Sequence, residues 1–449
     1  MKVTTSYKTK IPGYNAIFDG TLEIYRAALE YLIEVVNTIW ETIPKDILLS
    51  SQAMFVERVI HDTSKRVTGY DFDQKFHKFP SYLRRSAISE AIGIVKSFRS
   101  NYVRWEKNKK QGNPPKLQTK HRAFPTMYKG NMYERDGAYM AKIKINYRND
   151  WVWLEVRLRK SDVDYIFHHK AQSKELSPTL IKKGKNWWLR FTYEDQRNLP
   201  KYVKTVTTVD LGINNAATCS AMLPDGTIIG RKVIRFPIEQ DRMEHNANKI
   251  KKAQKHGARK TPVMWAHVNC WNRALSERTA GAVIEFALKF GSDAIIVEHL
   301  DLQGKKHGKK KQKLHLWRKK TVIGMLKCKA HLNNMRVSTV NAMNTSALAF
   351  DGSGPVERGK YLQNGVEVKN YSMCTFANGK IYHCDLNATY NIGARYFIRE
   401  ILKSLPETER LEVEAKVPQL SKRTTCTLSD LISLDAELKR MAASVLTSV

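Results

Sequence analysis

The sequence predicts a multidomain α+β protein, and three observations lead to that fold class. The chain has 449 residues, a length that accommodates roughly two to four domains. Early in the chain the apolar positions recur mostly at helical spacing, whereas from about 118 to 200 they alternate with a period of two. Beyond residue 203, short apolar runs that suit buried strands alternate with segments of helical spacing. We therefore expect a helical unit, a β unit and a mixed unit, in that order.

The amino-terminal segments predict one strand followed by helices. Residues 3–11 alternate weakly, which is typical of a strand. The apolar spacing that follows predicts a helix over 19–43, with Asp19 as a candidate N-cap. Further apolar repeats predict helices near 51–62 and 80–107. The last of these helices has one apolar face and one basic face, and the basic face carries Arg84, Arg85, Lys96, Arg99 and Arg104.

A charged segment separates these helices from a set of strands. Residues 107–122 are rich in Lys and broken by Gly and Pro, which is typical of a linker or an extended arm. Beyond it, alternation with a period of two predicts strands over 140–147, 151–158 and 186–193. The early strand at 3–11 could belong to the same sheet, with the helical unit inserted between them.

The carboxyl-terminal half mixes strands with helices. One strand ends at Asp210, and the pair Asp225-Gly226 is a hairpin signal before another strand. Residues 344–372 are polar, Gly-rich and predicted to be irregular. The remaining segments are predicted to be helical over 238–290, 385–402 and 428–446, and to be buried strands over 293–300 and 335–340.

Charge is the strongest compositional signal. Lys and Arg number 76 against 43 Asp and Glu, so the formal net charge is +33. A chain this basic repels itself and is expected to bind a large anionic partner, with nucleic acid as the first candidate and an anionic membrane surface as the second. The sequence has no apolar run as long as the roughly 18 residues that a membrane span needs. Its start lacks the apolar core of a signal peptide.

The six cysteines are scattered along the chain without a C-x-x-C pair. This pattern argues against a disulfide framework and favours a reducing cytoplasm. It also excludes an ordinary four-cysteine zinc ribbon, so we expect no zinc.

Three acidic residues stand where strands or loops meet the core of the carboxyl-terminal half. Asp210 ends the strand VTTVD, Glu298 ends IIVE, and Asp385 opens a helix. Three carboxylates from distant segments can hold two divalent ions about 3.5–4 Å apart, as in-line phosphodiester cleavage requires, and hard oxygen ligands favour Mg²⁺ or Mn²⁺. Taken singly, each acid has an alternative: DLG also occurs at the phosphate loops of actin-like ATPases, and Asp385 could be only an N-cap. His299 and His383 flank two of the acids and could be ligands, proton relays or hydrogen-bonded structural residues.

Taken together, the three motifs resemble a known family. The order VDLGINNAATCS, IIVEHLDL, CDLNATYNIGARY is similar to the split RuvC-type nuclease domain of transposon-encoded TnpB proteins and compact type V CRISPR effectors, whose pattern is D-x-G, E-x-L and D-x-N-A-A-x-N-I. Asp210, Glu298 and Asp385 match the three acids, and Thr389 replaces the second Ala of the last motif. The resemblance extends over about 203–400.

The resemblance implies a fold and a domain order. It implies an RNase H-like (RuvC) mixed α/β nuclease core, with an N-terminal β wedge domain that a helical recognition domain interrupts. NTSALAFDGSG occupies the place of the family's T-S-x-x-C-x-x-C-G, which leaves Cys374 and Cys384 near a zinc ribbon without its metal. The implied domains are a wedge over 1–15 and 118–200, a recognition domain over 16–117, a nuclease over 201–343 and 385–403, a degenerate zinc-ribbon insertion over 344–384 and a tail over 404–449.

Basic segments are candidate nucleic-acid surfaces. An RNA-guided nuclease holds a heteroduplex by its backbone and needs much Lys and Arg for this. A basic run is also commonly a solvated loop, and an aromatic ring among charges either stacks on bases or packs in a core. By the resemblance, the segment around Trp317 is a lid over the active site; the alternative is a surface helix with one buried Trp. The candidate contacts are Arg84, Arg85, Arg99, Arg104, Lys109, Lys110, Lys309, Lys310, Lys311 and Trp317.

The resemblance implies an RNA-guided DNA endonuclease of the prokaryotic cytoplasm, acting at the nucleoid. Its partners would be a structured guide RNA and double-stranded DNA beside a short flanking motif, and its cofactors two Mg²⁺ or Mn²⁺ ions held by the three acids. The main alternative is a nuclease-silent, RNA-guided repressor. An actin-like ATPase and a transposase that cuts and joins are further alternatives, and the charge and the missing second Gly-rich loop count against the ATPase.

Overall fold

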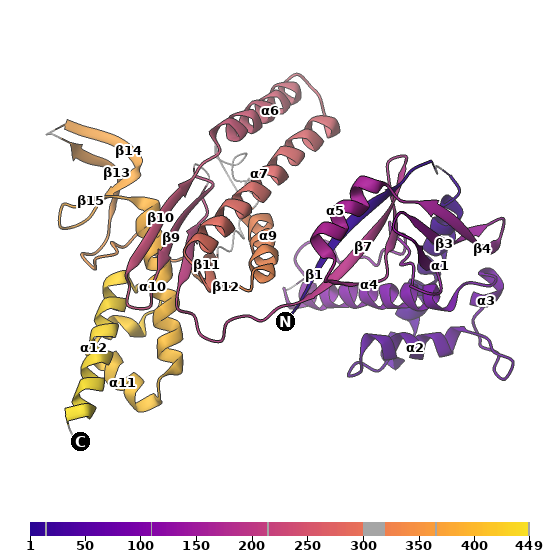
Figure 1. Cartoon of the computed structure of the whole chain (residues 1–449), viewed down its shortest axis with the longest axis horizontal. Helices are drawn as coiled ribbons and strands as arrows, with labels where there is room; N and C mark the ends of the chain where they lie inside the picture. The colour runs from indigo at the N-terminus through magenta and orange to yellow at the C-terminus, as the bar shows by residue number, and fades with distance from the viewer. Residues whose placement is uncertain (14–15, 109, 213–214, 300–318, 364–365, 448–449) are drawn as a thin grey trace. The chain divides into compact units, whose positions relative to one another are not determined.

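The chain divides after Asp195 into an amino-terminal and a carboxyl-terminal unit (Figure 1). The amino-terminal unit spans Lys2–Asp195, and the carboxyl-terminal unit spans Gln196–Val449 with Met1. No helix in the described part of the chain is long and apolar enough to cross a membrane. The computed structural model describes all residues except 14–15, 109, 213–214, 300–318, 364–365 and 448–449.

The amino-terminal unit contains two sheets. The first is formed by β1 (Lys2–Ile11), β5 (Lys174–Glu175), β6 (Thr179–Lys183) and β7 (Asn186–Gln196). The second is an antiparallel meander of β2 (Tyr133–Asp136), β3 (Met140–Tyr147) and β4 (Asp150–Arg157). Because β1 lies beside β7, the prediction that the first strand joins the sheet of the later β unit is confirmed.

Helices pack with both sheets around one continuous core that includes the fully buried Tyr25 and Trp187. The first helix ends at Thr38 rather than at residue 43, where a short 3₁₀ turn (Trp40–Thr42) follows. Asp19 is the first residue of this helix rather than its N-cap, which is Phe18. The helices are α1 (Asp19–Thr38), α2 (Leu49–Ile60), α3 (Phe72–Lys75), α4 (Ser81–Lys107) and α5 (Lys160–Lys170).

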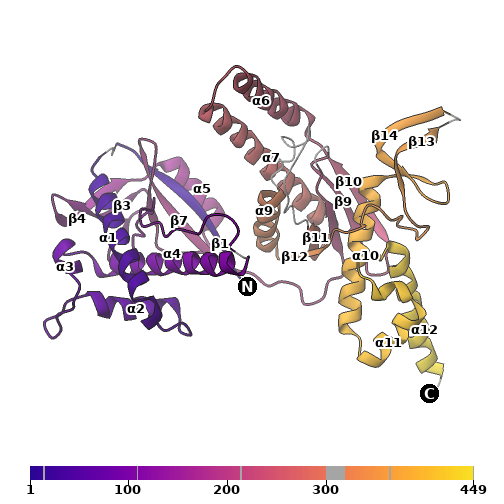
Figure 2. The ribbon, with the colours of Figure 1, turned by 180° about the vertical axis from the view of Figure 1, so that it is seen from behind.

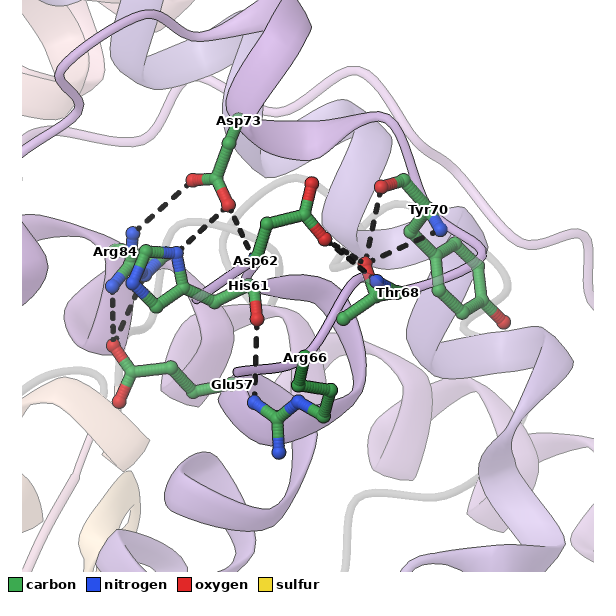
Figure 3. Close-up of polar contacts among 8 residues, drawn as sticks. All are labelled: Glu57, His61, Asp62, Arg66, Thr68, Tyr70, Asp73 and Arg84. Carbon is green, nitrogen blue, oxygen red and sulfur yellow. Dashed lines mark hydrogen bonds and ion pairs between the residues drawn. The ribbon is translucent and has the colours of Figure 1, made fainter. Parts of the chain in front are cut away.

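A buried ion network joins α2, α3 and α4 (Figure 3). Arg84 on α4 is 5% exposed and pairs with Glu57 of α2 at 3.0 Å and with Asp73 of α3 at 3.5 Å. Asp73 also hydrogen-bonds to Nδ1 of His61 at 2.8 Å. Since a buried guanidinium needs paired charges, this network fixes the three helices to one another.

The carboxyl-terminal unit is built on a five-stranded mixed sheet in the order β10-β9-β8-β11-β12. The first three strands are antiparallel neighbours, whereas β8, β11 and β12 run parallel. This arrangement is the RNase H-like core that the resemblance implied. The strands are β8 (Val206–Asp210), β9 (Ala217–Met222), β10 (Ile228–Ile234), β11 (Ala294–His299) and β12 (Arg336–Asn341).

Helices cover both faces of this sheet (Figure 2). One face packs its Val206 and Ile296 against α10 and α12, and the other packs its Val209 and Val297 against α7 and α9. The basic stretch 238–290 is helical, as predicted, and consists of two helices. The helices of this unit are α6 (Pro237–Lys255), α7 (Pro262–Lys289), α9 (Lys319–Leu332), α10 (Cys384–Ser404), α11 (Glu407–Lys416) and α12 (Leu428–Thr447).

The prediction that 344–372 is irregular is wrong for its second half. Strands β13 (Glu357–Gln363) and β14 (Val366–Thr375) form an antiparallel hairpin, and β15 (Ile381–His383) extends it to three strands. The polar and glycine residues that predicted a loop are compatible with this small three-stranded sheet, because so small a sheet has little core to bury and therefore little apolar alternation.

Candidate active site

Asp210 is the last residue of β8 and Glu298 the last but one of β11, and the two strands are parallel neighbours. Val209 of β8 is paired with Val297 of β11, so the acids that follow them lie next to each other at the same end of the sheet. Successive side chains along a strand point to opposite faces. Because Val209 and Val297 pack toward α7 and α9, both acids face the layer of α10.

Asp385 lies in the first turn of α10, which covers this face. Its Oδ2 accepts hydrogen bonds from Asn215 Nδ2 at 2.6 Å and from Thr218 Oγ1 at 3.5 Å. Thr218 on β9 is the cross-strand partner of Asp210, so the third acid reaches the same edge as the other two. The N-cap of α10 is His383, and the alternative that Asp385 is only an N-cap is therefore wrong.

Asn215 is a site residue that the sequence analysis did not identify. It is 6% exposed, and Arg235 Nε donates to its Oδ1 at 2.6 Å. This contact fixes the amide so that its NH₂ group faces Asp385. Gly212 leaves no room for a side chain, because a Cβ there would lie 2.8 Å from the carbonyl oxygen of Asn215.

Glu298 is 7% exposed, and its carboxylate accepts a hydrogen bond from the hydroxyl of Thr345. Arg395 of α10 lies near it: burial lowers the pKa of this guanidinium, while the charge of Glu298 acts in the opposite direction. Arg395 is itself fixed by four backbone carbonyls, those of Asn341, Met343, Thr424 and Cys426.

Two asparagines of α10 brace the segment that carries Thr345. Asn391 Nδ2 donates to the carbonyls of Thr345 at 3.0 Å and of Leu348 at 2.9 Å. Asn387 Nδ2 donates to Leu348 at 2.8 Å. Asn391 also accepts a bond from the backbone N–H of Leu428 at 3.2 Å. The two Asn of the motif DLNATYNI therefore support the site, and the carboxyl-terminal segment belongs to that support.

The chemistry of the three carboxylates fits a hard divalent cation, because Mg²⁺ and Mn²⁺ prefer oxygen ligands. Among the residues that the structure describes, no group of three or more His, Cys, Asp or Glu side chains is close enough together to hold a metal ion. Here Asp385 and Glu298 contact Asn215, Thr218 and Thr345 instead. The assignment of metal ligands to the three acids stays a prediction.

An apolar cluster packs beside the small sheet of β13, β14 and β15. Ala349, Cys374, Phe376 and Cys384 are buried together, and Phe350 packs edge-on against Phe376 at 5.4 Å between ring centroids. A hydrogen bond with Cys384 and burial raise the pKa of the Cys374 thiol. This cluster stabilises the small sheet by apolar packing, and the expected lack of zinc remains a prediction that elemental analysis of the purified protein would test.

The structure corrects one of the predicted nucleic-acid contacts. Arg84 is buried in the ion network of α2, α3 and α4, so its guanidinium is not offered to a phosphate. Arg85 is partly exposed but binds Glu57 at 2.7 Å, and Arg99 donates to Asn37 Oδ1 at 3.0 Å. Arg104 and Lys110 are exposed, as a phosphate contact requires. The remaining predicted contacts lie outside the described residues. They are Lys109, Lys309 to Lys311 and Trp317, together with the predicted lid around Trp317.

The two histidines differ in their surroundings. His299 is exposed at the end of β11. His383 is half-buried, and neither of its ring nitrogens has a hydrogen-bond partner among the described residues. The interpretation of His383 as a hydrogen-bonded structural residue is therefore not supported.

Comparisons with known proteins agree with this fold. The chain resembles Cas12f1, a compact type V CRISPR effector, in its complex with sgRNA and target DNA: the TM-score is 0.50 at 13% identity, over 84% of this chain and 81% of that one. This likeness confirms the predicted RNase H-like core and the resemblance to type V effectors at the level of fold.

Other similar structures are more distant. C2c1 of Alicyclobacillus acidoterrestris with single-guide RNA has a TM-score of 0.45 at 10% identity, over 84% of this chain and 66% of that one. The mini-RNA-guided endonuclease CRISPR-Cas_phi3 has a TM-score of 0.47 at 12% identity, over 87% of this chain and 92% of that one. The sequence model of the Aq_aa04 family matches residues 3–147. No curated protein sequence matches the chain.

Proposed function

We propose that the chain is an RNA-guided DNA endonuclease of the type V kind. The observation that carries this proposal is the position of three acids at one edge of the sheet, on its α10 face: Asp210 and Glu298 from adjacent strand ends, and Asp385 beside the cross-strand partner of Asp210. The net charge of +33 supports a polyanionic partner. The Cas12f1 structure of the same fold contains sgRNA and target DNA.

In the proposed reaction the acids hold the cofactor and their neighbours hold the acids. Asp210, Glu298 and Asp385 would bind two Mg²⁺ or Mn²⁺ ions, which when bound polarise the phosphate and activate water for in-line attack. Asn215 and Thr345 orient the carboxylates of Asp385 and Glu298. Such positioning supports the reaction, because small displacements of catalytic groups cost large factors in rate.

The main alternative is a nuclease-silent protein that uses its guide to bind DNA and repress transcription. It shares the fold and the charge, and only the acids distinguish the two functions. All three acids are present here and lie on one face of the sheet, which favours cleavage. We further propose that the protein acts at the nucleoid in a prokaryotic cytoplasm, with a guide that derives from a transposon end or a CRISPR array.

The experiment has two steps. RNA that copurifies with the protein is sequenced, and its unpaired end defines a matched DNA target. The RNA-loaded protein is then incubated with matched and mismatched duplex DNA, with Mg²⁺ or with EDTA. We expect cleavage of the matched duplex with Mg²⁺, and its loss with EDTA or without RNA.

Isosteric variants test whether the three acids carry the cleavage. Asp210→Asn, Glu298→Gln and Asp385→Asn should each abolish cleavage and leave RNA binding nearly unchanged, because guide affinity rests on distant phosphate contacts. Guide-dependent DNA binding without cleavage by the unaltered protein would establish the repressor. Cleavage without RNA would leave a plain RNase H-like nuclease, ATP turnover would indicate the ATPase, and strand-transfer products would indicate a transposase.

A further inference from the structure

A recess between β1 and α5 has aromatic walls. Its volume is about 410 Å³, and Tyr7 of β1 and Tyr165 of α5 line it from opposite elements. The centroids of the two rings are 5.9 Å apart, with an angle of 51° between the ring planes. Tyr165 is 53% exposed, so part of its side chain is available to a ligand.

Neighbouring residues hold these two rings in place. His169, one turn along α5, stacks on Tyr165 at 4.1 Å with an interplanar angle of 29°. Nδ1 of His169 hydrogen-bonds to the backbone oxygen of Tyr165 at 2.7 Å, which fixes the imidazole. Tyr193 of β7 packs edge-on against Tyr7 at 6.1 Å. The walls are therefore preorganised, and binding would cost little ordering of side chains.

Two basic residues, Lys8 and Arg159, lie beside the recess. Lys8 Nζ lies 4.6 Å from the ring centroid of Trp188, and the guanidinium of Arg159 lies 5.4 Å from the same ring. The one acid that lines the recess, Asp162, pairs with Arg159 at 2.7 Å and accepts from the backbone N–H of Lys10 at 2.9 Å. Because its charge is compensated, Asp162 does not repel a phosphate.

We propose that this recess binds one unpaired base of an RNA strand, which stacks on Tyr165 with its edge toward Tyr7. Unstacked bases bind aromatic side chains in this way, whereas a base inside a duplex has both faces covered. The charge of the exposed Lys8 would attract the phosphate backbone toward the recess. Ser6 and Ser161 also line the recess, and their hydroxyls suit a ribose 2′-OH, the group that distinguishes RNA from DNA.

This inference rests on the proposed function, since it makes the unpaired base part of the bound guide. The inference also extends the proposed function. The amino-terminal unit would recognise the folded RNA through a single extruded nucleotide, and this recognition would not depend on the acids in the other unit. The charge of +33 explains attraction to any nucleic acid, but the recess explains a preference for unpaired RNA.

The test uses the full chain freed of RNA and a short single-stranded RNA that carries 2-aminopurine. We expect the fluorescence of the base analogue to be quenched on binding. Tyr165→Ala should remove the quenching and weaken binding by about 5- to 150-fold, the range reported for single base–aromatic stacks when converted to affinity. Tyr165→Trp should restore both. The matched control is Tyr147→Ala, which removes a tyrosine of similar exposure, 43%, from the other sheet of the same unit.

Three outcomes would contradict base binding in the recess. Tyr165→Ala could bind the RNA with unchanged affinity and quenching, or Tyr147→Ala could weaken binding as much as Tyr165→Ala does. The same sequence, offered as DNA or as duplex RNA, could also bind as tightly as the single-stranded RNA and with the same dependence on Tyr165. Cleavage assays on the same samples keep the two proposals apart. If Tyr165→Ala loses the RNA while the unaltered, RNA-loaded protein cuts no DNA, the recess stands and the endonuclease proposal fails. If the unaltered protein cuts and Tyr165→Ala binds RNA normally, only the recess fails.

Discussion

The hydroxyl of Thr389 lies 2.6 Å from the hydroxyl of Ser220, and this hydrogen bond joins α10 to β9 inside the core. Both residues are fully buried. Thr389 also donates to the carbonyl of Leu386 at 2.7 Å, so Ser220 is the donor to Thr389. Thr389 stands where the resembled motif has Ala, and Ser220 supplies the partner that a buried hydroxyl requires.

The pair should therefore be energetically coupled. Thr389→Ala leaves the Ser220 hydroxyl buried without its partner, and Ser220→Ala leaves Thr389 with one bond instead of two. We expect each single change to lower the free energy of unfolding by about 1–3 kcal/mol. The double change should cost less than the sum of the two, with a coupling energy of about 0.5–3 kcal/mol. Denaturant unfolding of the unaltered protein, the two single variants and the double variant measures this double-mutant cycle. Strictly additive changes in the free energy of unfolding would contradict the coupling.

The acids were predictable from sequence because strands with a regular apolar pattern end at them. Asp210 and Glu298 follow buried runs whose parallel pairing sets them side by side. Asn215 and Thr345 were not predictable, because each contacts an acid from a loop without periodicity. Their partners lie 170 and 47 residues away in the chain. The specific fold came from the order of the motifs, whereas these supporting contacts depend on how the loops close in space.

Basic residues show a second limit of sequence interpretation. Arg84 and Arg104 occur on the same helix and carry the same charge, but Arg84 faces Glu57 and Asp73 inside the unit while Arg104 is exposed. Helical periodicity placed Arg84 on the basic face. The acids that pair with Arg84 come from α2 and α3. The sequence of α4 alone therefore cannot predict that this arginine is buried.

Gly393 allows α10 to approach the sheet closely. A Cβ at this position would lie 2.6 Å from Met222 Sδ and 2.8 Å from Thr208 Cγ2. We expect Gly393→Ala to destabilise the carboxyl-terminal unit by about 1–3 kcal/mol, because the core has no room for the methyl group. The displaced helix carries Asp385, so DNA cleavage should fall as well. Thermal unfolding and a cleavage assay measure the two effects.

Gly281 is the matched control, since it lies within α7 and a Cβ there meets nothing within 4 Å. Gly281→Ala should stabilise its helix by roughly 0.5–1 kcal/mol, because alanine loses less backbone entropy than glycine. If both substitutions had the same sign, close packing of α10 would not explain the effect at Gly393.

Arg84 and Arg104 should respond oppositely to removal of charge. Arg84→Met leaves Glu57 and Asp73 short of a buried partner, and breaking such a pair costs about 3–5 kcal/mol. We expect a large loss of stability in the amino-terminal unit. Arg104→Met should leave stability within about 0.5 kcal/mol, as is usual for surface changes, and should weaken RNA binding with a smaller salt dependence. Urea unfolding and RNA titration at several salt concentrations distinguish the two, and a purely RNA-binding defect in Arg84→Met would contradict the ion network.

Glu175 should make the amino-terminal unit sensitive to acid. Burial opposes ionisation of its carboxyl, but hydrogen bonds and charge from Lys129 and Arg135 and the hydroxyl of Tyr193 outweigh burial, so its pKa lies below the ordinary 4.5. Because the folded pKa is depressed, the ionised group contributes stability above pH 4.5, and this contribution is lost as the pH falls through the folded pKa.

Glu175→Gln should therefore lower the free energy of unfolding at pH 7 and flatten the fall of that free energy as the pH drops below 4.5, where the unfolded chain binds this proton and the folded chain does not. The glutamine keeps the size of the side chain and can still accept from Tyr193, so the change isolates the charge. Glu134→Gln, at an exposed position on β2, is the matched control. It should leave the fall of the unfolding free energy at acidic pH unchanged. Urea unfolding followed at several pH values measures both variants. If Glu175→Gln and the unaltered protein lose stability in parallel down to pH 3, the cluster of Lys129, Arg135 and Glu175 contributes no linkage, and the acid sensitivity of this unit has another source.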